Sequence, residues 1–242
     1  MELKLVHLYP DVLNLYGDRG NIAALVQRLT WRGIGVSVEN VKIGDALSLS
    51  GADLVFVGGG QDFEQEVLLS DLRGAKEREI RSAVEDGTVF LTICGGYQML
   101  GASYETFDGV KCDFIGALDL YTRGAKERMI GNYMFRLGEE SGGSVVVGFE
   151  NHSGRTYLGP GVSPLGTVLS GFGNNGEDKT EGAVYKNTFG TYSHGPLLPK
   201  NPAFADLLLS RALERRFGRP DLAPLDDAAE MRAHDEMRKR LS

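Results

Sequence analysis

One cysteine in this chain has the sequence context of a nucleophile. Residues 88–93, Thr-Val-Phe-Leu-Thr-Ile, form an apolar strand pattern that runs directly into Cys94, and Gly95 and Gly96 follow. A thiol on a sharp turn between a strand and a helix projects from the fold, and the helix N-terminus favours its reactive thiolate form. Gly96 leaves room for the turn, and Gly95 lets a backbone N–H approach a substrate oxygen. The pattern predicts a catalytic cysteine; the competing interpretation is a buried structural cysteine beside a turn.

A cysteine nucleophile needs a base, and the chain contains four histidines. We expect His7 to be packed inside a strand and His234 to be solvated on a polar helix. His194 follows an apolar strand pattern and precedes Gly-Pro, so it can project from the edge of a sheet. His152 has a similar placement in a more turn-like context. His194 is therefore the preferred base, and His152 is the alternative.

The elements expected around these residues indicate an α/β fold. Helical patterns lie between short apolar strands in the first half of the chain, with strands at 3–8, 36–43, 53–57 and 88–93 and helices at 22–33 and 63–84. This alternation predicts a mostly parallel central sheet flanked by helices, whose ligands bind outside the carboxyl ends of the strands. The turn Gly58–Gly60 and Cys94 both lie at such ends.

The second half of the chain changes to strands separated by turns rich in glycine and asparagine. These strands predict an antiparallel extension of the sheet and cover residues 118–122, 129–137, 144–149, 166–169, 182–185 and 189–192. Helices are expected again at 202–217 and 225–241. We therefore expect one domain over residues 1–217, followed by a linker and a charged helix over 218–242. That helix is either a solvated surface helix or a docking element for a partner.

Composition fits a soluble intracellular enzyme. A chain of 242 residues can bury one substantial core, and its formal net charge of −7 without a basic stripe argues against a nucleic-acid partner. Cys94 and Cys112 are the two cysteines, and we expect no disulfide between them, which favours a reducing compartment. No charged-then-apolar leader is expected, and no apolar run approaches the ~18 residues that span a bilayer. The expected location is the cytoplasm.

Several motifs together resemble a known family. Cys94-Gly-Gly-Tyr-Gln98-Met-Leu, with a glycine-rich turn upstream and a strand-end histidine downstream, resembles the class I (triad) glutamine amidotransferases. Within that family the chain is similar to the cobyric-acid-synthase-like branch, and most similar to glutaminase subunits that serve cell-wall precursor amidation. The motifs that point to this branch are Gly58-Gly-Gly-Gln-Asp62, Arg128-Met-Ile-Gly-Asn132 and Phe149-Glu-Asn-His-Ser-Gly-Arg-Thr156. The resemblance covers almost the whole chain and implies a three-layer, flavodoxin-like fold.

The resemblance also implies a role for each matched residue. Cys94 would attack the side-chain amide of glutamine, and His194 would protonate the departing ammonia and later activate water. Backbone N–H groups of Gly60 and Gly95 would form the oxyanion hole. Two polar side chains would hold the substrate, namely Gln98 and Arg128, whose guanidinium fork suits an α-carboxylate. The competing interpretations are a surface ion pair for Arg128 and a polar residue on a surface helix for Gln98.

The chain departs from the family at one position. Many triad amidotransferases carry a glutamate two residues after the histidine, whereas this chain reads His194-Gly195-Pro196. The orienting carboxylate is therefore elsewhere in the chain, supplied by a partner, or absent. A Cys–His dyad is chemically acceptable because cysteine needs less activation than serine.

The resemblance implies a partner and a pathway. The sequence contains no G-x-x-x-x-G-K-[ST] loop, although amidation of a carboxylate requires ATP, and we predict neither a metal site nor a cofactor in this chain. The resemblance implies a heterodimer with a Mur-ligase-like (MurT-like) synthetase that uses ATP and Mg²⁺ to amidate D-glutamate of lipid II. A cobyrinate-type or other cofactor-pathway amidation is the runner-up. A different cysteine amidase or peptidase and a catalytically silent binding subunit also remain open.

Overall fold

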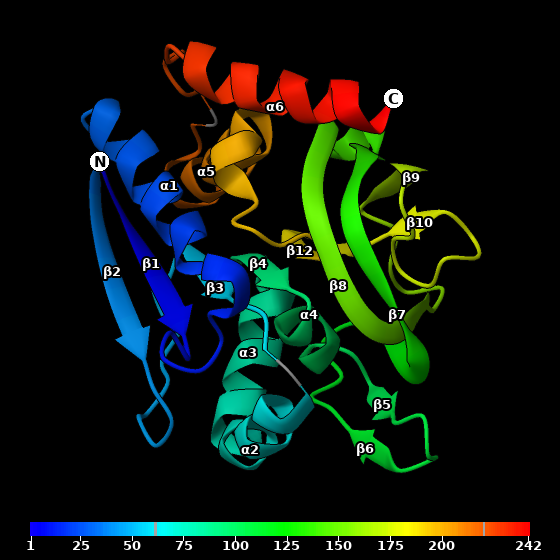
Figure 1. Ribbon diagram of the computed structural model, residues 1–242. Helices are drawn as coiled ribbons and strands as arrows, with labels where there is room; N and C mark the ends of the chain where they lie inside the picture. Colours follow the sequence, from blue (N-terminus) through cyan, green and yellow to red (C-terminus); the bar gives the residue numbers. More distant parts are fainter. Residues whose placement is uncertain (61, 220) are drawn as a thin grey trace.

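The computed structural model describes residues 1–60, 62–219 and 221–242, without the side chains of 62–66. Its central sheet has the strand order β11-β12-β4-β3-β1-β2 (Figure 1). These strands are β1 (Glu2–Leu8), β2 (Gly35–Val41), β3 (Leu54–Val57), β4 (Val89–Ile93), β11 (Ala183–Tyr185) and β12 (Thr188–Thr191). Neighbours pair in parallel except β11 with β12. Every residue of β3, β4 and β12 is buried, as expected for parallel strands covered on both faces.

Helices cover both faces of this sheet. α1 (Arg19–Trp31) links β1 to β2 and contacts α5 (Pro202–Phe217), which also packs on β3 and β4. α2 (Asp62–Leu72) and α3 (Ala75–Glu85) link β3 to β4 in the opposite direction along the sheet, so right-handed crossovers place them on the other face. The single helix expected over 63–84 is wrong, because Gly74 adopts a left-handed φ of 83° and separates two helices. The predicted three-layer α/β fold class is confirmed.

Most of the antiparallel strands form a second sheet rather than an extension of the first; β11 is the antiparallel strand that extends the central sheet. The second sheet contains β5 (Ser103–Glu105), β6 (Lys111–Asp113), β7 (Leu120–Leu137), β8 (Val145–Leu158), β9 (Gly166–Ser170) and β10 (Thr180–Glu181). β7 and β8 form a long, curved hairpin (Figure 1). Two short strands were expected over 118–137, but β7 is continuous, with a register shift between Gly124 and Met129.

Short 3₁₀ turns connect several of these elements. η1 (Leu15–Gly17) follows β1, and η3 (Leu198–Lys200) precedes α5; a third, η2 (Glu139–Ser141), connects β7 to β8. The short helix α4 (Gly95–Met99) follows β4 directly. The carboxyl ends of β1, β3, β4 and β12 therefore meet at one edge of the central sheet, which is where ligands bind in open parallel sheets.

The C-terminal helix α6 (Ala228–Leu241) packs on its own chain. It runs across α5 and one end of the β7–β8 hairpin, and it contacts η3 (Figure 1). His234 was expected to be solvated, but it is buried and its Nδ1 lies 2.9 Å from the carbonyl oxygen of Lys200. The boundary between 217 and 218 and a docking role for 218–242 stay predictions, and Pro220 lies outside the described residues. Among the described residues, none of the helices has the length and apolar character to cross a membrane.

A buried ion network attaches the segment before α6 to the domain. Arg28 on α1 donates to both carboxylate oxygens of Asp206 on α5, each at 2.7 Å, and to Asp227 at 2.6 Å. The Arg28 side chain is only 4% exposed, whereas the two carboxylates are about a quarter exposed. Bidentate guanidinium–carboxylate pairs are among the stronger ion pairs. The network therefore joins the first helix to both C-terminal helical segments.

We expect Arg28→Ala to lower the free energy of unfolding by about 2–3 kcal/mol, because it removes a buried guanidinium that pairs with Asp227 and leaves Asp206 with Arg32 alone. Urea denaturation followed by circular dichroism measures the change. Arg211→Ala is the matched control, since Arg211 pairs with Glu214 at 3.8 Å on the exposed surface of α5. The control should cost below about 0.5 kcal/mol. Equal losses of unfolding free energy in the two variants would contradict a strong stabilisation by the Arg28 ion network.

Candidate active site

Cys94 lies on a strained turn at the carboxyl end of β4. Its φ of 48° and ψ of −105° fall in a region that residues with a side chain rarely adopt, and such strain costs about 1–3 kcal/mol. The backbone N–H of Cys94 donates to the carbonyl oxygen of Thr191 at 2.8 Å, which fixes the turn against β12. A Cβ on Gly96 would lie 2.7 Å from the carbonyl oxygen of Gly58, so glycine alone fits there. Cys94 as a residue is 5% exposed, and both cysteines are free.

His194 lies at the carboxyl end of β12, the strand next to β4. Its backbone N–H donates to the carbonyl oxygen of Phe149 on β8 at 2.8 Å, in a bridge between the two sheets. The imidazole is fully buried. The structure thus brings the two predicted catalytic residues, Cys94 and His194, to the same edge of the central sheet.

Asp18 provides a carboxylate beside this imidazole. Its Oδ2 lies 3.5 Å from His194 Nδ1 and accepts the backbone N–H of Gly59 at 2.7 Å. Asp18 is fully buried, and its other oxygen makes no hydrogen bond within the described part of the chain. Sequence analysis missed this residue, because an aspartate directly before a helix is the usual sign of a helix cap. Asp18 occupies the N-cap of α1 but makes no cap hydrogen bond, so its carboxylate is available to the site.

The electrostatics of the site favour a protonated imidazole. Burial alone lowers the pKa of His194, but the charge of Cys94 and the carboxylate of Asp18 outweigh it and raise the pKa to about 10. Neither imidazole nitrogen makes a hydrogen bond of ordinary geometry to a described residue. Asp18 lies 3.5 Å from Nδ1, and Cys94 is the other charged neighbour of the imidazole. In the absence of substrate, catalytic hydrogen bonds are often longer than in the bound complex. The arrangement can hold a thiolate–imidazolium pair.

The turn after β3 forms another wall of the site. Gly58, Gly59 and Gly60 are all buried, and Gly95 is buried at the start of α4. Gly60 and Gly95 therefore follow neighbouring strands, but an oxyanion hole made by their N–H groups stays a prediction. Gln61 of the predicted motif lies outside the described residues.

We expect Gly59→Ala to lower kcat by about 100-fold, because a mislocated catalytic group costs this much even at a displacement of ~1 Å. A Cβ on Gly59 would lie 2.5 Å from His194 Cε1 and 3.1 Å from Asp18 Oδ2, so the imidazole must move. Steady-state glutamate release from glutamine measures the effect. Gly138→Ala is the control, since a Cβ there meets its nearest neighbour at 3.8 Å and the φ is −59°. An active Gly59→Ala enzyme with normal kcat would contradict this geometry.

The two predicted substrate-binding residues have different environments. Gln98 is buried, and its Nε2 donates to Tyr192 Oη at 2.9 Å, so the surface-helix interpretation is wrong. Arg128 is exposed on β7 and donates through Nε to Asn151 Oδ1 at 2.8 Å and through Nη2 to the Asn151 carbonyl at 3.0 Å. These bonds go to neutral groups on β8, so the fork retains its positive charge. Binding of glutamine by either residue stays a prediction.

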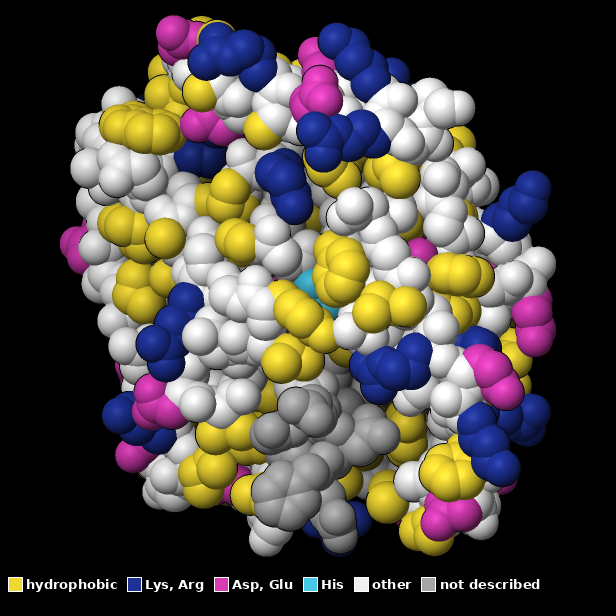
Figure 2. Space-filling view, in the orientation of Figure 1, with side chains coloured by type: hydrophobic (Ala, Val, Ile, Leu, Met, Phe, Trp, Pro, Cys, Tyr) yellow, Lys and Arg dark blue, Asp and Glu magenta, His cyan; other side chains and the backbone are white. Residues whose placement is uncertain are grey.

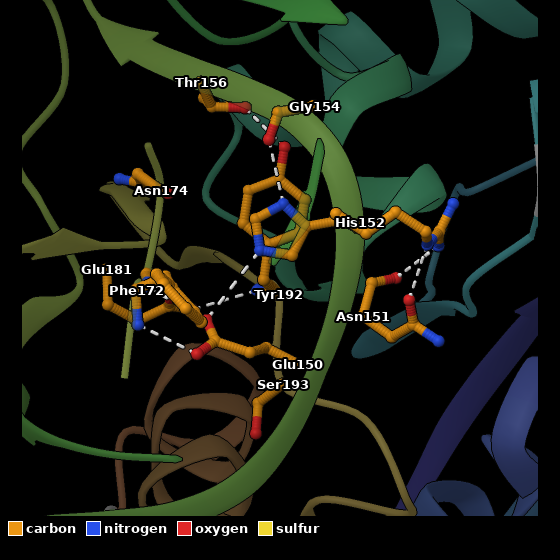
Figure 3. A network of polar contacts seen from close by, with 12 residues as sticks. Glu150, Asn151, His152, Gly154, Thr156, Phe172, Asn174, Glu181, Tyr192 and Ser193 are labelled. Atoms are coloured by element: carbon orange, nitrogen blue, oxygen red, sulfur yellow. Dashed lines mark hydrogen bonds and ion pairs between the residues drawn. The ribbon is translucent and has the colours of Figure 1, made fainter. Parts of the chain in front are cut away.

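His152 is a packed residue inside β8, not part of a turn, because β8 continues to Leu158. Its ring stacks on Tyr192 with centroids 3.5 Å apart, and its Nδ1 lies 2.8 Å from the Gly154 carbonyl (Figure 3). Burial lowers the pKa of His152, and the nearby Glu150 carboxylate opposes this only in part. The neutral His152 ring therefore packs against Tyr192 as a structural contact. His7 is likewise buried, as expected.

A buried polar network holds the strand that carries His194 (Figure 3). Glu181 accepts Thr191 Oγ1 at 2.6 Å and the backbone N–H of Tyr192 at 2.9 Å. Burial raises the pKa of Glu181 to about 7. Tyr192 Oη also contacts Thr156 Oγ1 at 2.6 Å, which links β12 to β8. Among the described residues, no cluster of three or more His, Cys, Asp or Glu has the arrangement of a metal site.

The site places a cysteine on a strained turn, a histidine and a carboxylate at the carboxyl edge of a parallel sheet, which are the residue types that amide-cleaving cysteine enzymes use. Residues 4–202 match the sequence profile of the CobB/CobQ-like glutamine amidotransferase domain, and the chain belongs to this family. A solved glutamine amidotransferase from Thermotoga maritima has a similar fold, with a TM-score of 0.56 at 16% sequence identity over 98% of this chain and 94% of that chain.

Curated relatives narrow the comparison. The chain is 44% identical over 232 residues to the GatD subunit of the glutamine-hydrolysing lipid II isoglutaminyl synthase from Staphylococcus aureus (strain N315), covering 96% of this chain and 93% of that protein. It is 39% identical to the subunit of the same name from Streptococcus pneumoniae (strain ATCC BAA-255 / R6), covering 90% of this chain and 83% of that protein. The similarity thus extends over most of the length of both relatives.

Proposed function

We propose that this chain is the glutamine-hydrolysing subunit of a lipid II isoglutaminyl synthase. The observation that carries the proposal is the position of His194 between Cys94 and the carboxylate of Asp18. The likeness to two GatD subunits over most of their length supports the choice of substrate and pathway.

The proposed reaction is glutamine hydrolysis through a thioester. The Cys94 thiolate attacks the side-chain amide carbon, and the oxygen of the tetrahedral intermediate takes the negative charge. N–H groups of Gly60 and Gly95 would stabilise that charge. The intermediate collapses as His194 transfers a proton to the departing ammonia, leaving a glutamyl thioester. His194 then removes a proton from water, which attacks the thioester, releases glutamate and restores the thiol.

The second part of the proposal concerns the use of the ammonia. The relatives' names describe a subunit, so the chain would work in a complex, and we infer a heterodimer with a Mur-ligase-like subunit of the MurT type. That partner would bind ATP and Mg²⁺ and activate the α-carboxylate of D-glutamate in lipid II, and ammonia would convert it to D-isoglutamine. Both the precursor and ATP are available in the cytoplasm, which is the location we propose for the complex. The 218–242 segment is a candidate docking element for it.

The proposal is tested by measuring glutamate release from L-glutamine by the chain alone and with the Mur-ligase-like subunit, with L-asparagine as the competing substrate. We expect release from glutamine, and ATP-dependent amidation of lipid II only with the partner. Arg128→Met should raise KM for glutamine by at least about 10-fold, because a bidentate contact to the α-carboxylate is lost. Arg123→Met, on the same strand and 61% exposed, is the matched control. Absence of glutamate release with and without the partner would refute the function.

A further inference from the structure

Tyr16 lies between β1 and Asp18 in the sequence, and its backbone conformation is unusual. It lies in η1 with φ 57° and ψ 22°, a left-handed conformation that costs a residue with a side chain about 1–2 kcal/mol. Its side chain is nevertheless 41% exposed, so burial of the ring does not account for the strain. Gly17 follows with a φ of 80° and open space around its Cβ position. Backbone hydrogen bonds from Leu15 N–H to the Gly59 carbonyl and from Gly17 N–H to the Asn14 carbonyl hold the turn, and contacts of the Tyr16 side chain add to them.

The Tyr16 ring packs directly on the catalytic histidine. Its centroid lies 5.0 Å from that of His194 at an interplanar angle of 69°, and 5.4 Å from that of Phe149 at 68°. Edge-to-face pairs at these distances are favourable. His194 is fully buried, although it stands at the edge of the sheet, and Tyr16 is the half-exposed residue that lies on it. Hydrophobic side chains are prominent on the face of the molecule shown in Figure 2.

A chain of hydrogen bonds connects Tyr16 to the arginine expected to bind substrate. Asn151 Nδ2 donates to Tyr16 Oη, and Asn151 Oδ1 accepts from Arg128 Nε. The Asn151 carbonyl accepts from Arg128 Nη2, so Asn151 occupies one complete edge of the guanidinium fork. A carboxylate bound side-on by Arg128 needs that same pair of parallel donors. A carboxylate that binds this Nε–Nη2 edge therefore competes with Asn151 for Arg128.

We propose that Tyr16 controls access to Cys94 and His194, and that a carboxylate bound by Arg128 releases it through Asn151. This inference rests on the proposed function. In the closed state, Asn151 and the two aromatic contacts hold Tyr16 over the imidazole. When a carboxylate takes the Nε–Nη2 edge of Arg128, Asn151 loses both acceptor contacts and its amide no longer fixes the Tyr16 hydroxyl. The strained backbone then relaxes and the ring leaves the site, so the nucleophile opens to molecules that present an α-carboxylate.

The test measures the rate at which iodoacetamide alkylates Cys94, resolved by peptide mass spectrometry, with Cys112 on β6 as the internal reference. Tyr16→Ala should raise the rate at Cys94 by at least about 10-fold, because an open minor state is populated at about 10% or less. Tyr121→Ala is the matched control: Tyr121 is 39% exposed and stacks on Tyr157 on the outer hairpin. An unchanged rate in Tyr16→Ala, or an equal rise in Tyr121→Ala, overturns the proposal.

Two further variants test the link to Arg128. Asn151→Leu and Tyr16→Phe should both raise alkylation at Cys94, each by less than Tyr16→Ala, because both remove the Asn151–Tyr16 hydrogen bond but keep the ring and its aromatic contacts. Unchanged alkylation in Asn151→Leu overturns the link. Alkylation requires no glutamine, so these results stand apart from the proposed function: a chain without glutaminase activity can still show the Tyr16 effect, and an active glutaminase can lack it.

Discussion

Cys94→Ala is expected to lower kcat for glutamate release by at least about 10⁴-fold while the fold survives. Removal of the nucleophile in an acyl-transfer site leaves only the contributions of binding and of the oxyanion hole, and losses of this size or larger follow. Alanine keeps the same backbone constraint at φ 48°, so the strain of the turn is unchanged. Glutamate release gives the activity, and thermal unfolding by circular dichroism gives the stability.

Cys112→Ala is the control for this variant. Cys112 lies on β6 in the second sheet and is half-buried, away from the catalytic edge. It should retain normal kcat and KM. Substantial glutamate release by Cys94→Ala would remove the thioester mechanism, whereas loss of activity in both variants would point to a general effect of cysteine replacement.

Asp18→Asn is expected to lower kcat by about 10³-fold with little change in KM. A neutral amide cannot stabilise the imidazolium, and it can hold the imidazole in the wrong tautomer. The loss should be smaller than the ~10⁴-fold known for serine enzymes, because a thiol is the better nucleophile. Asp11→Asn is the matched control, since Asp11 is exposed and pairs with Lys42 at 3.0 Å. A normal kcat in Asp18→Asn would leave a functional Cys–His dyad.

The pH dependence separates a charge effect of Asp18 from loss of structure. The pKa of His194 is raised to about 10, so its imidazolium persists through neutral pH and is lost only as pH rises towards that value. Ammonia departure needs the imidazolium, and kcat should therefore fall on the alkaline side. Asp18→Asn removes one cause of the raised pKa, so the alkaline limb should move to lower pH. A limb that stays in place while kcat falls would indicate a purely structural role.

The sequence predicted local structure well where the residues of one short segment determine the backbone conformation. A buried strand, Cys94 and two glycines leave few conformations, and the turn after β4 has the predicted form. Helix α5 begins and ends at the predicted residues because Pro202 opens it and Gly218, with φ 64°, closes it. His194 was correctly placed at a strand end for the same reason, since Gly195 and Pro196 interrupt the strand pattern.

Contacts between distant segments could not be predicted in the same way. Asp18 meets His194 although the two are 176 positions apart in the sequence, and nothing in the local pattern of Asp18 distinguishes it from a helix cap. The polar stretch around His152 reads as a turn, yet it pairs with β7 in the middle of a long hairpin. The strain at Tyr16 has no sequence signal, because a tyrosine does not favour a left-handed backbone. Each of these features depends on tertiary packing rather than on local propensity.

The backbone hydrogen bond between His194 and Phe149 has a consequence for how turnover can be tuned. His194 follows β12 of the central sheet, and its backbone is held by β8 of the second sheet. A displacement of the β7–β8 hairpin therefore moves His194 through this one backbone hydrogen bond, and the packing of the central sheet need not change. Substitutions in the β7–β8 hairpin, remote from the active site, should therefore change the rate of catalysis while every reacting group stays chemically unchanged.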